Sequence, residues 1–178
     1  MKGMVFTQFL EMVEQRFSMD MVDTIIDESN VPSGGVYTAV GTYPHEEMAS
    51  LVKALSEQTG IPIPGLLQAY GEHLFTALVG AFPHFLDGKS SSFDFLSVLD
   101  TYIHAEVRKL YPDAELPRFV IERAEPGRML MTYISTRHME DLARGLLLGC
   151  FKHFGETVVI ATEPLSNGDT RFLLTRVD

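Results

Sequence analysis

The first half of the chain carries apolar residues at helical spacing. Four stretches show this period, near residues 6–17, 21–26, 51–55 and 67–78. Ser18 can cap the second stretch, because its hydroxyl can accept a hydrogen bond from the first helical turn. Pro44 and Pro64 are placed to begin the third and fourth stretches, and Gly60 to end the third. The pattern predicts four helices in this half of the chain.

A fifth helix is predicted over Ser92 to Leu110, and Pro112 ends it. Its apolar residues form one stripe at about 100° per residue: Leu96, Leu99, Ile103, Val107 and Leu110. His104 lies beside this stripe, next to Asp100 and Phe93. A lone histidine in such a place is more often a packed or partly exposed residue than a metal ligand. Taken alone, His104 therefore remains an open candidate.

After Pro117 the spacing becomes that of extended strands. Apolar runs at 119–121 and 129–131 flank Glu125-Pro126-Gly127, and runs at 158–160 and 171–174 flank Asn167-Gly168. A helix from about Met139 to Phe154 lies between the two hairpins. This order, ββαββ, predicts a four-stranded antiparallel sheet with a helix on one face. With the helices that precede it, the chain is predicted to be α+β.

The composition is that of one globular domain with a large core. Of the 178 residues, 46% are hydrophobic and 21% charged, and the formal net charge is -10. Such a charge repels phosphate backbones and anionic headgroups, so nucleic acid and membranes are not expected as partners. Glu11 and Glu14 interrupt the first apolar stretch, so neither a signal peptide nor a membrane span is expected, and the predicted location is the cytoplasm. Cys150, the single cysteine, is interpreted as a core residue.

A second group of candidate residues follows the first predicted hairpin. In extended backbone, Tyr133, Ser135 and Arg137 would share one face and span about 13 Å, which suits a ligand with two carboxylates. The arginine can bind one carboxylate through two hydrogen bonds, and the hydroxyls can donate to the other. The alternative is a polar strand end that faces water. Arg176, in the last strand, is expected to be an exposed arginine.

Together these residues resemble a known family. A histidine in a helix, a proline soon after it and a Tyr-x-Ser-x-Arg motif about thirty residues further on are similar to the H-NOX family, the haem nitric oxide/oxygen binding domains. The opening Met1-Lys2-Gly3 and the chain length also fit a stand-alone bacterial member. The resemblance covers essentially the whole chain.

The resemblance implies a role for each matching residue. His104 is expected to ligate the iron of a b-type haem, held without covalent attachment because the chain has no Cys-x-x-Cys-His motif. Tyr133, Ser135 and Arg137 are expected to bind the propionates, and Pro117 to press on the porphyrin. The family's architecture implies an N-terminal helical distal part, about residues 1–65, packed on a proximal part, about residues 66–178, with the haem between them.

The resemblance also implies a sensor rather than an enzyme. The expected ligands are nitric oxide and carbon monoxide, and the expected signalling partner is a separate histidine kinase or cyclic-di-GMP enzyme. Oxygen-binding members use a distal tyrosine where this chain has Leu142, so a stable dioxygen complex is not expected. Three alternatives remain: a haem-free ligand-binding module of the same fold, an oxygen-binding haem sensor, and a haem enzyme such as a peroxidase.

Overall fold

In the computed structural model, which describes residues 1–177, strands appear only in the last third of the chain. The helices are α1 (Gly3–Arg16), α2 (Met19–Ser29), α3 (His45–Thr59), α4 (Ile63–Ala81), the 3-10 turn η1 (Pro83–Leu86), α5 (Ser92–Ser97), the π turn η2 (Leu99–Ile103), α6 (His104–Leu110) and α7 (Glu140–His153). The strands are β1 (Arg118–Glu125), β2 (Arg128–Ile134), β3 (Thr157–Pro164) and β4 (Thr170–Val177). The predicted α+β class and the ββαββ order are confirmed.

The residues expected to start and stop helices do so. The Ser18 hydroxyl accepts a hydrogen bond of 3.1 Å from the Met21 amide and caps α2. Gly60 ends α3 in the left-handed conformation, at a φ of 72°. Pro64 is the second residue of α4. The helix predictions for this half of the chain are therefore confirmed.

The predicted continuous helix from Ser92 to Leu110 is wrong, because the structure divides it into α5, η2 and α6. The Ile103 amide donates to the Val98 carbonyl at 3.2 Å, a bond that spans five residues instead of four. This wider turn makes His104 the first residue of α6. Turns of this kind are frequent at functional sites.

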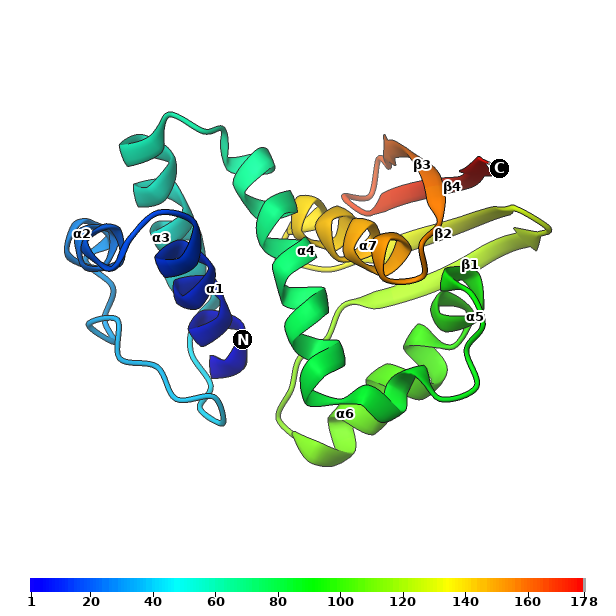
Figure 1. Cartoon of the computed structure of the whole chain (residues 1–178), viewed down its shortest axis with the longest axis horizontal. Helices are drawn as coiled ribbons and strands as arrows, with labels where there is room; N and C mark the ends of the chain where they lie inside the picture. Colours follow the sequence, from blue (N-terminus) through cyan, green and yellow to red (C-terminus); the bar gives the residue numbers. More distant parts are fainter. Residues whose placement is uncertain (178) are drawn as a thin grey trace.

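The four strands form one antiparallel sheet in the order β1-β2-β4-β3. Gly127 and Gly168 turn the two hairpins at φ values of 72° and 89°, which only glycine adopts readily. Helix α7 lies against one face of the sheet (Figure 1), and the residues buried there make the sheet core: Phe75, Met131, Tyr133, Leu147, Cys150, Phe151, Phe172 and Leu174. The apolar alternation of β2 and β4 therefore faces α7.

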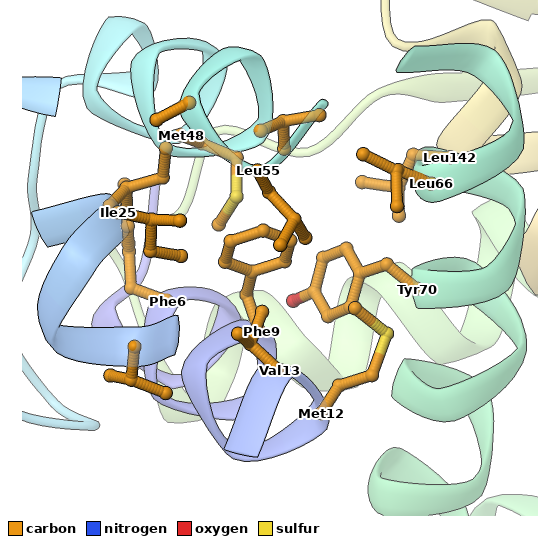
Figure 2. Close-up of a cluster of buried hydrophobic side chains, with 14 of the residues drawn as sticks. Phe6, Phe9, Met12, Val13, Ile25, Met48, Leu55, Leu66, Tyr70 and Leu142 are labelled. Atoms are coloured by element: carbon orange, nitrogen blue, oxygen red, sulfur yellow. The ribbon is translucent and has the colours of Figure 1, made fainter. Parts of the chain in front are cut away.

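A second core lies among the N-terminal helices, on the other side of α4 (Figure 1). Figure 2 shows this helical core, which includes Phe6, Phe9, Met12, Val13, Ile25, Met48, Leu55, Leu66, Tyr70 and Leu142. Helix α4 supplies Tyr70 to the helical core and Phe75 to the sheet core. The two cores therefore share one helix.

Helices α4 and α7 cross at a pair of glycines. A Cβ atom on Gly145 would lie 2.2 Å from the carbonyl oxygen of Gln68, and one on Gly71 would lie 2.6 Å from the Cα atom of Gly145. Real Cβ atoms essentially never come within 3.0 Å of such atoms. Glycine at both positions is what permits this close backbone approach.

Candidate functional site

His104 lies at the junction of η2 and α6, and its ring is largely buried. Its Nδ1 atom is 3.3 Å from Oδ1 of Asp100, the neighbour expected from the helical spacing. The other expected neighbour, Phe93, instead lies under the guanidinium of Arg176, at 5.1 Å. Burial lowers the pKa of the His104 imidazole, while Asp100 and the Pro117 carbonyl act in the opposite direction. At neutral pH the ring is therefore uncharged and can offer a lone pair to a metal.

One aromatic ring links His104 to the Tyr-x-Ser-x-Arg motif. Phe119 pairs with Tyr133 across β1 and β2. The Phe119 ring centroid lies 6.0 Å from that of His104 and 5.4 Å from that of Tyr133. Burial raises the pKa of Tyr133, so its hydroxyl keeps its proton. The structure thus brings two parts of the chain that are thirty residues apart into one apolar region.

Ser135 and Arg137 do not continue the strand, which corrects the extended geometry expected for the motif. Strand β2 ends at Ile134, and the Ser135 hydroxyl then accepts a hydrogen bond of 3.2 Å from the Arg137 amide. This local bond closes a turn that competes with extended backbone. The Arg137 guanidinium binds Glu115, at 2.6 Å from Oε2 and 3.2 Å from the backbone carbonyl.

Arg137 also lines a pocket of about 290 Å³ between the N-terminus and the loop that follows α6. The pocket lining is Met1, Lys2, Thr42, Tyr43, Pro44, His45, Asp113, Ala114, Glu115 and Arg137. Lys2 donates to Asp113 at 3.1 Å, and the amino group of Met1 donates to the Tyr43 carbonyl at 2.7 Å. Burial and Arg137 lower the pKa of that amino group. Sequence spacing gave no signal for this grouping, because its segments are far apart in the chain: Met1 and Tyr43 are 42 residues apart, and Glu115 and Arg137 are 22 apart.

The donor set fits a haem. His104 offers a ring nitrogen near the apolar ring of Phe119, and the ring of Tyr133 also lies near that of Phe119. Arg137 is 15% exposed, whereas its partner Glu115 is 84% exposed. An exposed carboxylate is readily solvated, so a propionate could replace it on Arg137. Pro117, half-buried between α6 and β1, is the residue before the strand that carries Phe119.

Apolar groups surround Leu142, the residue at which oxygen-binding members are expected to have a tyrosine. Leu142 is buried beside Leu66 and Tyr70 (Figure 2). The Tyr70 hydroxyl donates to the Val5 carbonyl. Gln8 donates to Glu11 at 2.9 Å on the exposed side of α1.

Three further observations concern other features that could carry a function. Within residues 1–177, no group of three His, Cys, Asp or Glu side chains is arranged to hold a metal ion. Over the same residues, no helix combines the length and apolar character needed to cross a membrane. Arg176 is not the exposed residue expected from the sequence: it binds Glu156 at 3.0 Å, and its Nε atom is buried.

Comparison with known proteins places the chain among solved haem proteins. A family model for haem-NO-binding domains matches residues 2–162. The Fe(II) unliganded H-NOX protein from K. algicida is 38% identical over 100% of this chain and 97% of its own, at a TM-score of 0.95. The H-NOX from Shewanella woodyi, bound to IWP-051 in the Fe(II)CO state, is 39% identical over 99% of this chain and 95% of its own, at a TM-score of 0.85.

A more distant structure agrees in fold alone. The H-NOX protein from S. oneidensis in the Fe(II)NO state is 23% identical at a TM-score of 0.92, and the match covers 100% of both chains. A search of curated proteins finds no match. The family model spans most of the chain, and two solved H-NOX proteins share more than a third of its residues across nearly its whole length. The chain therefore belongs to the H-NOX family, whose members are haem-binding gas sensors.

Proposed function

We propose that this protein senses nitric oxide through a ferrous b-type haem ligated by His104. The observation that carries the proposal is the largely buried His104 ring, which one phenylalanine joins to the Tyr-x-Ser-x-Arg motif. Haem, when bound, supplies an iron with one coordination position open to a diatomic gas. H-NOX structures in the Fe(II)NO and Fe(II)CO states support nitric oxide and carbon monoxide as the ligands.

The proposed propionate anchors are Tyr133, Ser135 and Arg137. Tyr133 keeps its proton and can donate a hydrogen bond, and Arg137 can exchange the exposed carboxylate of Glu115 for a buried propionate. Pro117 would contact the porphyrin from the loop that precedes β1. These roles support binding and positioning, and no catalytic step is proposed for any residue.

The proposed selectivity favours nitric oxide over dioxygen. Bound dioxygen gains from a distal hydrogen-bond donor, whereas nitric oxide binds ferrous haem strongly without one. Leu142 offers no donor, and the Tyr70 hydroxyl is already bound to the Val5 carbonyl. Both observations favour an apolar distal side.

Signalling is proposed to start at His104. While His104 is bound to the haem iron, the junction of η2 and α6 would be fixed in place. If His104 were released from the iron, η2 and α6 could pack against their neighbours in a second arrangement. The distal part (about residues 1–65) and the proximal part (about residues 66–178) would then shift relative to each other. The proposed receiver is a separate histidine kinase or cyclic-di-GMP enzyme, in line with the family resemblance.

Replacement of His104 by glycine tests the function. His104→Gly protein should hold haem poorly, and added imidazole should restore a ferrous haem spectrum. His138→Gly is a matched control, because His138 is exposed and its positive φ of 50° suits glycine. Unchanged ferrous spectra of His104→Gly protein without imidazole would refute the assignment of the iron ligand.

A further inference from the structure

Asp100 makes two contacts with groups of very different exposure. Its Oδ1 atom faces Nδ1 of His104 at 3.3 Å, and its Oδ2 atom lies 3.9 Å from Nε of Arg118. The Arg118 side chain is 64% exposed, whereas that of His104 is 12% exposed. Solvent weakens the contact with Arg118 much more than the contact with His104. The histidine is therefore the main partner of this carboxylate.

The π turn sets this geometry. Asp100 lies within η2, and His104 directly follows it. The wider turn of η2 includes hydrogen bonds from the amides of Tyr102 and Ile103 to the same carbonyl, that of Val98, at 2.8 and 3.2 Å. The carboxylate and the imidazole are thereby fixed on one side of the segment by backbone structure as well as by their own contact.

The carboxylate also bears on which nitrogen of His104 carries the proton, and it competes for that proton with the Pro117 carbonyl. A neutral imidazole has one N–H, and a charged acceptor binds it more strongly than a neutral carbonyl does. Asp100 therefore favours the proton on Nδ1 and leaves the Nε2 lone pair free. A carboxylate that accepts this second ring N–H raises the basicity of a metal-bound histidine and fixes its orientation.

We propose that Asp100 is a positioning residue that accepts the Nδ1–H of His104, strengthens the bond from Nε2 to the haem iron and so opposes the release of His104. This inference rests on the proposed function, because it requires a haem bound by His104. It assigns Asp100 a part in setting how readily a bound gas triggers the release.

Resonance Raman spectroscopy of the ferrous protein measures the bond directly. Asp100→Asn is nearly isosteric and replaces a charged acceptor by a neutral one, so the iron–histidine stretching band should shift to lower wavenumber. Glu106→Gln is the matched control, since it removes the same charge from α6 at a residue that pairs with Lys109 at 2.6 Å. The control should leave the band where it is in the wild type.

Rescue with external ligands tests the hydrogen bond itself. In His104→Gly protein, imidazole can donate an N–H to Asp100, whereas N-methylimidazole cannot. We expect imidazole to bind about tenfold more tightly than N-methylimidazole, which is the usual effect of a hydrogen bond to a charged group. The double variant with Asp100→Leu should lose most of this preference, and the double variant with Glu106→Gln should keep it.

The outcomes separate this inference from the proposed function. Wild-type protein without haem or without an iron–histidine band would overturn the proposed function, and with it the inference. Wild-type and Asp100→Asn proteins that show the same band, together with an imidazole preference unchanged by Asp100→Leu, would overturn the inference alone. If Asp100 had only a structural role, its replacement would lower the unfolding temperature of the protein. The iron–histidine band and the preference for imidazole would then stay unchanged.

Discussion

Replacement of Gly145 by alanine is a sharp test of how α4 and α7 are packed. The added Cβ atom would lie 2.2 Å from the Gln68 carbonyl oxygen and 2.8 Å from its Cα atom. Both atoms belong to the backbone of α4, so no side-chain rotation can relieve the contact. An ordinary contact begins at 3.4 Å, and the two helices must therefore separate by roughly 1.2 Å.

Two opposing terms set the size of the effect. Overpacking of a core contact costs about 1–3 kcal/mol, and the better helix propensity of alanine returns about 0.5–1 kcal/mol. The free energy of unfolding should therefore fall by about 1–2 kcal/mol. With a denaturant slope of about 2 kcal/mol per M of urea, in the middle of the usual range, the midpoint should fall by roughly 0.5–1 M.

Urea titration followed by circular dichroism measures this midpoint. Gly80→Ala is the control, because Gly80 lies in α4 and a Cβ atom there meets nothing within 4 Å. The control should keep or raise the midpoint. If Gly145→Ala proved as stable as Gly80→Ala, the close approach of the two backbones would not be a constraint and the reasoning would fail.

Four further predictions concern the haem site and the core. Arg137→Ala should lose haem to an acceptor protein much faster than Arg128→Ala, since Arg128 is exposed; equal rates would count against propionate binding. Leu142→Tyr should move the reduced protein toward a persistent oxy spectrum in air, because it would add a hydrogen-bond donor on the side proposed to be distal; an unchanged spectrum would count against that placement of residue 142. Pro117→Ala should flatten the porphyrin, visible in the out-of-plane modes of the resonance Raman spectrum, and identical spectra would remove this proline from the mechanism. Burial raises the pKa of the Cys150 thiol, so iodoacetamide should label it only after unfolding, and rapid labelling of the native protein would contradict its burial.

Sequence alone predicted the features that depend on local patterns. The two hairpins were visible because Gly127 and Gly168 occupy turn positions that need positive φ. The capped start of α2 was visible because Ser18 precedes an apolar stretch. His104 and the Tyr-x-Ser-x-Arg motif were recognised by residue type and spacing, and their roles stay predictions.

The features that sequence missed depend on contacts between distant segments. Apolar periodicity cannot show that the Ile103 amide bonds to Val98, so the π turn was read as continuous helix. The ion pair of Arg137 with Glu115 depends on how the loop after α6 packs against the end of β2. Arg176 was expected to be exposed, but Glu156 reaches it from the turn between α7 and β3.

The shared helices α4 and α7 have a consequence for folding cooperativity. Tyr70 and Phe75 lie five residues apart on α4 and belong to different cores, and Leu146 of α7 packs against both. If either the helical core or the sheet core unfolded, the other core would lose the packing of the shared helices. The two cores should therefore unfold together in a single two-state transition. A mutation deep among the N-terminal helices would then lower the protection of amide hydrogens in the sheet, far from the altered side chain.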